Sequence, residues 1–480
     1  DGIYETATQD QAPLGPEAGF ALPDGDGGLD LYVTSQWVHV DHRQIIACLD
    51  MAPDAVRCHP AGIGGAFGSR EDISLHIHVA MLALATGRPV KMVYDRTESF
   101  TGHVKRHPAR MWYRHEANAD GKLVKVTAQL LLDGGAYAHT SRAVLANAAF
   151  FTVGPYRCDN VFVDASVVKT NNPPAGAMRG FGAVQTCFAS ESQMDRLAAE
   201  LEMDPLELRR VNALAAGDPM STSGQIIEGS LPTLEVLDAV EAIPLPDALD
   251  GDDPRLLPGG TGLTTSPDSV VRGVGYALGL KNLAFSEGFD DFAEARVVMT
   301  PAGVEVHTAA MEVGQGLVTV CQQITRTVLG TDQVAVVWDD TSKIGSAGST
   351  SASRQTQMTG GAVHAAAVGL RDQILSDHGG DELRGDGVYR DGALVATIED
   401  VCASGVVEHH VRFRHPETFP PDDNGQGDVH AGFVVAAHRA VVDVDPELGL
   451  VRVVRVDMAQ DVGKALNPQA ITGQLEGGIM

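Results

Sequence analysis

The sequence predicts an α+β fold divided between two mixed domains. Three observations support this: runs with strand-like alternation, glycine-bearing loops that lead into amphipathic helices, and one stretch rich in Pro, Gly, Asp and Ser between two such sets. The chain has 480 residues, more than one hydrophobic core usually serves. We therefore expect a first domain over residues 1–215, a linker or surface excursion over 216–270, and a second domain over 271–480.

Composition and charge exclude several classes of function. The formal net charge of −28 would repel nucleic acids and anionic membrane surfaces, so neither is expected as a partner. No apolar run reaches membrane-spanning length and no signal peptide opens the chain, and we expect a cytoplasmic protein. The six cysteines are scattered without a CxxC pair, so neither a zinc nor an iron–sulfur ligand set is expected.

The first domain opens with a short alternating strand, LDLYVTSQ, which ends at Gln36. A glycine cluster around Gly65 and Gly68 then leads into a helix of about fourteen residues, with Phe67 at the loop tip and Glu71 in the first helical turn. The cluster is not a dinucleotide-binding fingerprint, because its spacing is only approximate and no acidic residue follows in the expected place. Its backbone N–H groups nevertheless suit an anionic or oxo ligand.

The rest of the first domain alternates β-rich and helical stretches. Gly87 is typical of a helix C-terminus. Residues 90–170 predict mainly strands, with a hairpin turn at 119–121. Asp204 and Pro205 are typical of the first residues of a helix.

The most distinctive stretch is residues 171–196, NNPPAGAMRGFGAVQTCFASESQMDR. Its two prolines stiffen the approach, and its glycines let the backbone come close to a bulky group. Arg179 supplies a planar set of donors suited to an anionic or oxo-rich ligand, and Phe181 offers an aromatic face. Taken alone, the stretch fits a glycine-rich loop with a solvated arginine about as well as it fits a ligand site.

The second domain continues with a strand pair over 294–310 that turns at 301–303. Gly314 and Gln315 precede an amphipathic helix that Gly330 ends, and a strand over 333–340 leads to a hydroxyl-rich loop and another helix. Residues 376–430 look irregular and acidic, as an insertion would. A long hairpin turning at 445–449 follows, and Asn467 begins a last helix that carries Gln474.

Four small-residue loops therefore run into helices and present backbone N–H groups together with amide, hydroxyl or guanidinium donors. The sequence contains no HExxH motif, no Cys/His cluster, no P-loop and no nucleophile elbow. A large anionic ligand that brings its own metal suits such a chain, because the protein then supplies orientation and electrostatics.

These motifs resemble the molybdenum-binding subunit of the xanthine dehydrogenase family, the molybdenum hydroxylases. GGAFGSRE resembles the family's GGGFGGKE, and PPAGAMRGFGAVQ resembles NTAFRGFGGPQ. MEVGQGL resembles TEMGQGL, and DVGKALNPQAITGQLEG resembles DVGxxLNPxxxxGQxEG. The GSTSASRQT loop and the GQGDVHAGFVVAAHRAVVDVD segment look most like bacterial members with separate subunits. The resemblance implies two elongated mixed domains of the aldehyde oxidase/xanthine dehydrogenase molybdopterin-binding type, with the cofactor held between them.

The resemblance also implies roles for individual positions. Four would surround the molybdenum without ligating it through their side chains: Gln36, Phe67, Arg179 and Ala352. The cofactor as a whole would be bound by Gln36, Gly65, Phe67, Gly68, Arg179, Gly314, Gln315, Ser351, Ala352, Ser353, Arg354, Gln355, Thr356 and Gln474. The substrate would meet Glu71, Phe181, Phe285 and Asn147.

Two departures from the family pattern matter. The family's substrate-binding arginine aligns near Asn147, so that contact is missing or is supplied by Arg142. The family's general-base glutamate would lie beyond Met480, so we expect a chain truncated at both ends, with no catalytic residue of its own and inactive alone.

The implied activity is hydroxylation of a purine, xanthine or hypoxanthine, with water as the oxygen source. The cofactor would be molybdenum–molybdopterin in its cytosine dinucleotide form, and electrons would pass to 2Fe–2S clusters and FAD on partner subunits, in a dimer of heterotrimers. No cysteine accompanies Arg179, which disfavours a carbon monoxide dehydrogenase. The alternatives are an aldehyde or N-heterocycle hydroxylase of the same superfamily, or a fragment that only binds partner subunits.

Overall fold

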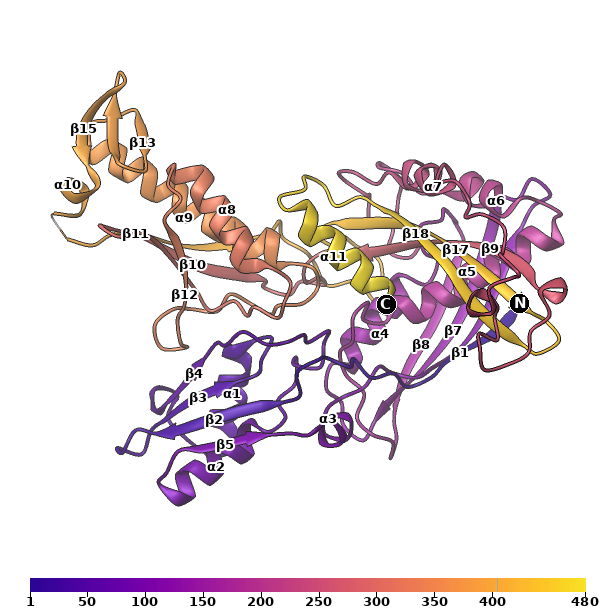
Figure 1. The fold of residues 1–480 in the computed structure, drawn as a ribbon, viewed down its shortest axis with the longest axis horizontal. Coiled ribbons are helices and arrows are strands. Elements are labelled where there is room, and N and C mark those ends of the chain that lie inside the picture. The colour runs from indigo at the N-terminus through magenta and orange to yellow at the C-terminus, as the bar shows by residue number, and fades with distance from the viewer. Residues whose placement is uncertain (404) are drawn as a thin grey trace.

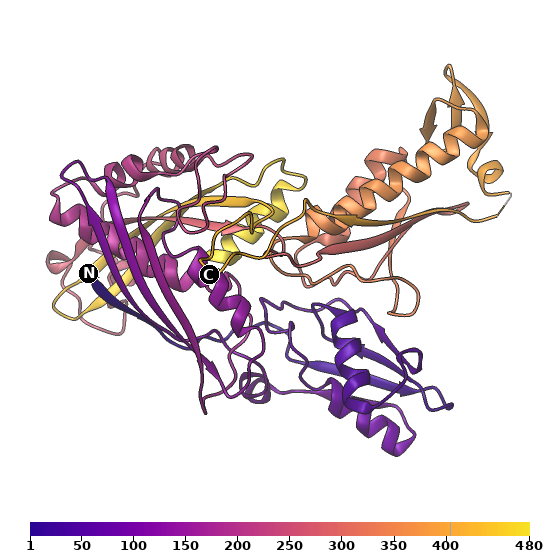
Figure 2. The same ribbon diagram turned by 180° about the vertical axis from the view of Figure 1, so that it is seen from behind.

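The computed structural model describes residues 1–403 and 405–480, which form three lobes (Figure 1). Lobe 1 is built from residues 15–95, lobe 2 from two sheets that combine early and late parts of the chain, and lobe 3 from residues 290–414. Lobes 1 and 3 lie on the same side of lobe 2, as the view from behind also shows (Figure 2).

Lobe 1 is a four-stranded sheet, in the order β4-β3-β2-β5, covered by two helices. The elements are β2 (Ala18–Pro23), β3 (Leu29–Val33), α1 (Val38–Leu49), β4 (Val56–His59), α2 (His76–Thr86) and β5 (Val90–Val93). Alternate residues of β3, such as Leu29 and Leu31, are buried against α1 and α2. Gly87 ends α2 in the left-handed conformation, as predicted.

One prediction for lobe 1 is wrong, and one of its helices was not predicted. Helix α2 begins at His76, so Glu71 does not lie in its first turn, and the glycine cluster runs through turns before the helix begins. Helix α1 was not predicted, because Asp41 occupies one of its buried positions and so interrupts the apolar pattern.

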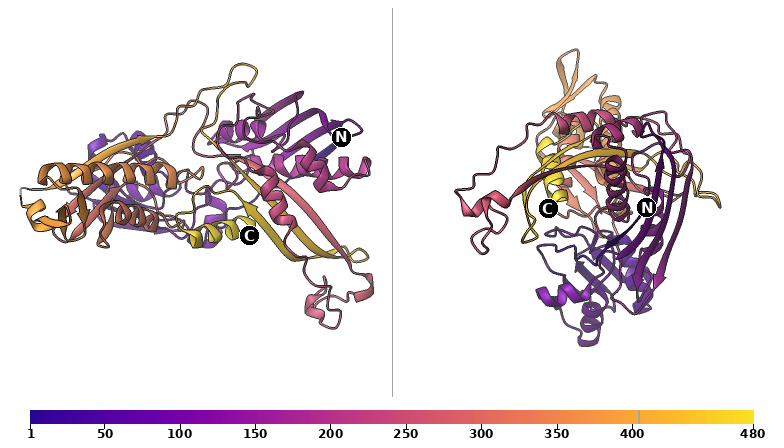
Figure 3. Two further views of the ribbon diagram at one scale, coloured as in Figure 1. Left: turned by 90° about the horizontal axis from the view of Figure 1, so that it is seen from above. Right: turned by 90° about the vertical axis from the view of Figure 1, so that its right-hand side faces the viewer.

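Lobe 2 packs two sheets around helix α5 (Ala183–Glu200), which contacts strands of both. One sheet has the order β1-β6-β7-β8 and the other β18-β17-β9. Their strands are β1 (Gly2–Thr6), β6 (Ala109–Ala117), β7 (Leu123–Gly135), β8 (Val161–Lys169), β9 (Val271–Asn282), β17 (Phe433–Asp445) and β18 (Leu450–Gln460). The predicted hairpin turns at 119–121 and 445–449 are confirmed, and β17 and β18 are the long strands in the yellow part of the colour scale in Figure 3.

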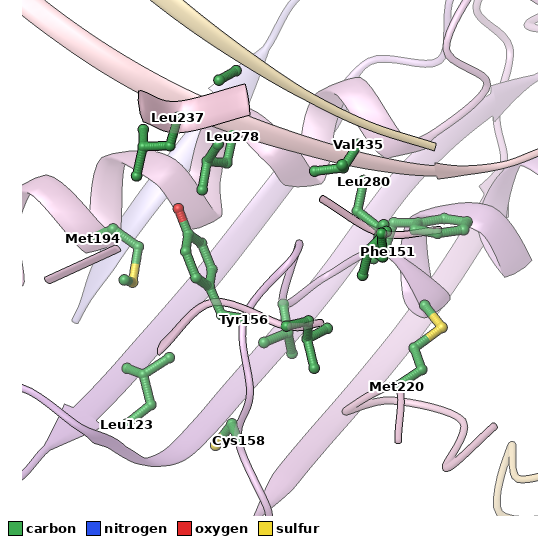
Figure 4. Close-up of a cluster of buried hydrophobic side chains, with 14 of the residues drawn as sticks. Leu123, Phe151, Tyr156, Cys158, Met194, Met220, Leu237, Leu278, Leu280 and Val435 are labelled. Atoms are coloured by element: carbon green, nitrogen blue, oxygen red, sulfur yellow. The ribbon is translucent and has the colours of Figure 1, made fainter. Parts of the chain in front are cut away.

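The core of lobe 2 draws on both halves of the sequence. Tyr156 and Met194 are fully buried beside Leu278, Leu280 and Val435 (Figure 4). Pairing of β9 with β17 in antiparallel register brings these late strands against the helices of the first half. The two sequence halves are therefore joined through one shared core.

Four further helices complete lobe 2: α4 (Ser141–Phe150), α6 (Pro205–Asn212), α7 (Thr233–Glu241) and the short α3 (Arg96–Gly102) at its junction with lobe 1. Asp204 caps α6 as predicted, its side chain accepting the N–H groups of Leu206 and Glu207. Helix α7 lies in the expected linker, and its Leu237 and Val240 are fully buried. This part of residues 216–270 therefore packs into lobe 2 and does not run only over the surface.

Lobe 3 is a mixed sheet, in the order β12-β11-β10-β16, packed under two long helices. The elements are β10 (Phe292–Thr300), β11 (Gly303–Thr308), α8 (Leu317–Leu329), β12 (Val334–Trp338), α9 (Gln355–His378) and β16 (Val407–Arg414). The predicted strand pair, its turn and the αL glycine after α8 are confirmed. Helix α11 (Pro468–Ile479), capped by Asn467, lies between lobes 2 and 3 (Figure 1).

The prediction of an irregular insertion at 376–430 is wrong for residues 382–402 and 407–414. The segment forms a small sheet and a short helix before β16: β13 (Glu382–Arg384), β14 (Gly387–Arg390), β15 (Ala393–Thr397) and α10 (Ile398–Cys402). Strand β16 alternates half-buried and exposed residues without interruption, and that period of two was readable in the sequence. Among the described residues, no helix combines the length and apolarity needed to cross a lipid bilayer.

Candidate functional site

The side-chain amide of Gln36 joins two loops that are distant in sequence. Its Oε1 accepts the N–H groups of Gly68 and Arg70 at 3.1 and 3.2 Å. Its Nε2 donates to Glu71 Oε1 at 3.1 Å and to the Thr350 carbonyl at 2.9 Å. Gln36 is only 3% exposed, so this amide is a buried link between lobe 1 and the loop before α9.

The loop of Arg179 contacts the same region of lobe 1. The Arg179 N–H donates to the Phe67 carbonyl at 2.8 Å. Gly68 has a φ of +108°, and a Cβ there would lie 2.5 Å from the Ala177 oxygen. Arg179 Nη2 in turn donates to the Gln474 carbonyl of α11 at 2.7 Å. Segments around Gln36, Phe67, Arg179 and Gln474 therefore meet at one junction between the lobes, which we call the loop junction.

The loop before α9 reaches the junction through Ala352, whose carbonyl accepts the Ala284 N–H at 3.0 Å. The side chain of Arg354 in this loop is completely buried. Its Nε and Nη2 donate to Asp291 at 2.9 and 2.6 Å, and its remaining donors reach three backbone carbonyls. All five guanidinium donors are thus used within the protein. The side chain of Arg354 therefore braces the loop, and a cofactor-binding role for this position stays a prediction.

Gln355, Gln315 and their neighbours also bond within the protein. Gln355 Nε2 donates to the Ser349 carbonyl at 3.1 Å. Gln315 bonds the backbone of its own turn, accepting from Val313 N–H at 2.7 Å. Glu312 was not predicted as a site residue, yet its carboxylate accepts the Gly314 N–H at 2.9 Å and two further N–H groups at the start of α8. This carboxylate occupies donors that we expected to face an anion.

Other expected binding positions remain open to a ligand. Ser353 and Thr356 are exposed at the first turn of α9, where backbone N–H groups have no intrahelical partner. Ser351 is half-buried in the same loop, and Gly65, with a φ of +91°, lies against the Phe67 ring. This part of the junction suits the phosphate end of a cofactor.

Several residues without glycine's freedom adopt left-handed backbone conformations at the junction. They are Phe67 (φ 55°), Phe181 (49°), Ala284 (60°), Ala352 (48°) and Ser353 (50°). Each such conformation costs on the order of 1 kcal/mol and persists only where the surroundings enforce it. Such strain gathers at ligand sites, which is consistent with a binding role for these loops.

The two aromatic candidates have different surroundings. Phe285 stacks on Trp37, with ring centroids 5.7 Å apart and an interplanar angle of 22°. Phe181 packs against the core beneath the β6–β8 sheet. Across the described ranges, no ring contact joins Phe181 and Phe285. A sandwich of a planar substrate between them therefore stays a prediction.

Glu71 is half-buried at the centre of the junction. Its Oε1 accepts from Gln36 and, at 2.7 Å, from the Ser349 hydroxyl. Burial raises the pKa of this carboxyl, against the hydrogen bonds that lower it. Asp41, behind it in α1, is completely buried, and burial raises its pKa to about 8.

Asn147 is paired with a lysine that no sequence motif singled out. Lys281 Nζ, at the end of β9, donates to Asn147 Oδ1 at 2.6 Å. Arg142, the alternative source of a cation, is exposed on α4. A lysine in an alternating strand resembles a surface residue in sequence, and only its contact with Asn147 of α4 reveals its burial.

Arg106 and Arg179 lie at the junction, and neither forms an ion pair with a carboxylate in the part of the chain that the structure describes. Burial alone lowers the pKa of Arg106 to about 10, and burial alone lowers the pKa of Arg179. Arg106 Nη2 donates to the backbone carbonyl of Arg179 at 2.9 Å and so holds the main chain of the Arg179 loop. Within residues 1–403 and 405–480, no three His, Cys, Asp or Glu side chains are placed to hold a metal ion. The donor set thus fits an anionic cofactor that carries its own metal.

Comparison with known proteins agrees with this geometry. Two molybdopterin cofactor-binding domain models match the chain, one over residues 1–213 and the other over residues 263–480. The aldehyde oxidoreductase from Desulfovibrio gigas has a similar solved structure, with a TM-score of 0.83 and 27% identity over 99% of this chain and 50% of that one. The fold and the site therefore define a molybdopterin-binding protein.

Two curated relatives narrow the assignment. The chain is 30% identical to a probable xanthine dehydrogenase subunit of Bacillus subtilis, covering 99% of this chain and 63% of that protein. It is 40% identical over 238 residues to the nicotinate dehydrogenase large molybdopterin subunit of Eubacterium barkeri, covering 50% of this chain and 56% of that protein. The chain belongs to the xanthine dehydrogenase family of molybdenum hydroxylases and spans only part of the length of these relatives.

Proposed function

We propose that this chain is the molybdenum-cofactor-binding part of a hydroxylase that oxidises a ring carbon of xanthine or hypoxanthine with oxygen from water. The observation that supports it is the convergence of the Gln36, Phe67, Arg179 and Ala352 segments at the loop junction. Among the described residues, Arg179 has no carboxylate partner there. When bound, the cofactor supplies the two-electron oxidation of the substrate carbon.

The residues of the chain would then bind and orient. The Arg179 guanidinium would hold an anionic or oxo-rich part of the cofactor, and Arg106 would hold the backbone of the Arg179 loop. The first turn of α9, beside Ser353 and Thr356, would hold the phosphate tail, which we propose to be a cytosine dinucleotide. Gln36 would keep the two loops at a fixed separation.

Glu71 supports a purine over a simple aldehyde. A carboxyl with a raised pKa can act both as a hydrogen-bond donor and as an acceptor. A purine offers ring nitrogens and N–H groups to such a carboxyl, whereas a simple aldehyde offers only one oxygen. We propose that the ring stacks on Phe181 or Phe285, since both aromatic side chains lie on loops of the junction.

The second candidate is hydroxylation of another N-heterocycle or of an aldehyde. The similarity to a nicotinate dehydrogenase subunit over half of the chain favours a heterocycle that carries a carboxylate. The structural likeness to an aldehyde oxidoreductase keeps aldehydes as the third class.

We propose partner subunits that carry 2Fe–2S clusters and FAD, assembled as a dimer of heterotrimers, because electrons must leave the cofactor. The chain's cysteines do not provide the cluster ligands: all six are free and none belongs to a metal-ligand group among the described residues. Free thiols also favour a reducing compartment, and we place the protein in the cytoplasm.

Steady-state kinetics of the full-length protein with its partner subunits test this proposal. We expect kcat/KM for xanthine or hypoxanthine to exceed that for benzaldehyde by at least ~100-fold, because a buried polar site rejects a substrate that leaves it unpaired. A preference for benzaldehyde would overturn the purine assignment. Preparations that hold the cofactor but oxidise none of these compounds would instead favour an inactive binding subunit.

A further inference from the structure

Lys281, near the end of β9, is half-buried, and its ammonium group forms no ion pair among the described residues. Its Nζ donates to Asn147 Oδ1 at 2.6 Å and to the side-chain oxygen of Asn282. The same nitrogen lies 5.0 Å from the centre of the Phe151 ring. In the part of the chain that the structure describes, no carboxylate oxygen lies within ion-pair distance of Lys281. Burial lowers the pKa of its ammonium group to about 7, and Glu287 raises it only from farther away.

The lysine lies between two loops of the junction. Three residues after it, Ala284 donates its N–H to the Ala352 carbonyl at 3.0 Å. On the other side, α4 carries Asn147 and packs closely on the Arg179 loop, where a Cβ on Gly182 would lie 2.3 Å from the Val144 oxygen. Lys281 therefore approaches the junction between the Ala352 loop and the Arg179 loop.

Removing an ammonium group from water is costly unless a negative charge compensates it. The amide oxygens of Asn147 and Asn282 satisfy two of its three donors but leave its charge uncompensated. His430 does not compensate the charge of Lys281. Burial lowers the His430 pKa to about 3, and its Nδ1 bonds the Ser286 hydroxyl at 3.0 Å. In a chain with 63 acidic and 35 basic residues, a cation left without a carboxylate is unexpected. An anionic or carbonyl oxygen from a ligand would complete its coordination.

We propose that Lys281 determines substrate specificity by donating a hydrogen bond to an oxygen on the substrate, either the exocyclic carbonyl of an oxopurine or a carboxylate on a planar ring. Asn147 positions the ammonium group, and Glu71 contacts the ring from lobe 1. This inference rests on the proposed function only in assuming that a planar substrate enters the loop junction.

The test uses the full-length protein with its partner subunits and two matched substrate pairs. Xanthine is compared with unsubstituted purine, and 4-carboxybenzaldehyde with benzaldehyde. We expect Lys281→Met to raise KM about 10- to 100-fold for the oxygen-bearing member, since a charge-assisted hydrogen bond is lost. The plain member should change by less than about three-fold, and kcat should change little in either case.

Three controls separate recognition from a structural role. Lys281→Arg keeps the cation and should recover most of the lost affinity. Lys125→Met changes an exposed lysine on β7 and should have no effect. The dissociation constant of xanthine, measured by calorimetry on each variant, should follow KM. If Lys281→Met weakens the affinity for both members of a pair equally, or for neither, the role of Lys281 is overturned.

The two proposals fail in different ways. If the parent enzyme oxidises the aldehydes but neither purine, the proposed purine function is wrong, and the aldehyde pair still decides the role of Lys281. If the parent prefers xanthine but Lys281→Met does not discriminate within the pairs, only the inference about Lys281 fails.

Discussion

Arg179 Nη2 donates a hydrogen bond to the Gln474 carbonyl at 2.7 Å, although 295 residues separate the two in sequence. A Cβ on Gly478, one turn farther along α11, would lie 3.3 Å from the same guanidinium. The Arg179 side chain, which is well suited to bind an anion, thus holds its own loop against helix α11. Arg179 has further donors that can serve a ligand at the junction.

Replacing Arg179 should impair cofactor retention more than folding. We expect Arg179→Met to lower the molybdenum content of the purified protein by about ten-fold or more, because a charge-assisted contact to an anionic cofactor is lost. Metal analysis by mass spectrometry measures this. Arg110→Met, on the exposed face of β6, is the matched control and should keep its molybdenum. Equal metal content in the two variants would contradict the role of Arg179.

Gln36→Ala should weaken the link between lobes 1 and 3. The substitution leaves the N–H groups of Gly68 and Arg70 and the Thr350 carbonyl without their partner. Buried polar groups without partners cost about 1–3 kcal/mol each, so we expect a loss of about 3 kcal/mol in the free energy of unfolding. Chemical denaturation measures it, and a loss below about 0.5 kcal/mol would show that the loops are held by other contacts.

Gly68→Ala tests the close approach of the lobe 1 loop to the Arg179 loop. Alanine is strained at a φ of +108°, and its Cβ would lie 2.5 Å from the Ala177 oxygen. We expect a loss of about 2 kcal/mol or more in stability together with reduced cofactor content. Gly275→Ala in β9 meets no atom within 4 Å and should be tolerated. Similar behaviour of the two variants would mean that the loops do not touch.

Asp41→Asn should change the pH dependence of stability. Burial raises the pKa of Asp41 from 3.8 to about 8, so the folded chain keeps a proton that the unfolded chain releases above about pH 4. At this site the unfolded state therefore binds fewer protons across the window, and the contribution of Asp41 to the free energy of unfolding falls as pH rises from about 4 to 8. The asparagine variant lacks this fall.

Relative to the parent, Asp41→Asn should gain roughly 2 to 5 kcal/mol between pH 4 and pH 8. Urea unfolding at several pH values measures the difference. His76 Nε2 lies 3.7 Å from Asp41, and burial lowers the His76 pKa to about 4, so we expect both groups to be neutral. A variant that loses stability across this window would instead indicate an ion pair.

Much of the fold followed from local signals in the sequence. Glycines at 87 and 330 end helices in the left-handed conformation, and Asp204 and Asn467 cap helices through their side chains. These features depend on a few neighbouring residues, so a sequence reveals them. Helix α1 was missed because Asp41 is buried only through the packing of α1 within lobe 1, which no local sequence pattern reports.

The sequence predicted the candidate site less completely than the fold. Glycine spacing indicated the loops that meet at Gln36 and Arg179. It did not indicate that Asp291 uses the donors of Arg354, or that Glu312 caps α8, because these partners are set by three-dimensional packing. Lys281 was missed for the same reason: its burial arises where β9 meets α4.

The proposed function requires that separate glycine-bearing loops bind one pterin-borne molybdenum that no side chain ligates. This is tested by the ratio of molybdenum to released pterin to protein in the full-length enzyme, purified with its partner subunits. We expect about one of each per chain, with metal and pterin falling together in Arg179→Met. Molybdenum without pterin, or pterin and metal that persist unchanged in Arg179→Met, would contradict a shared pterin site at the loop junction.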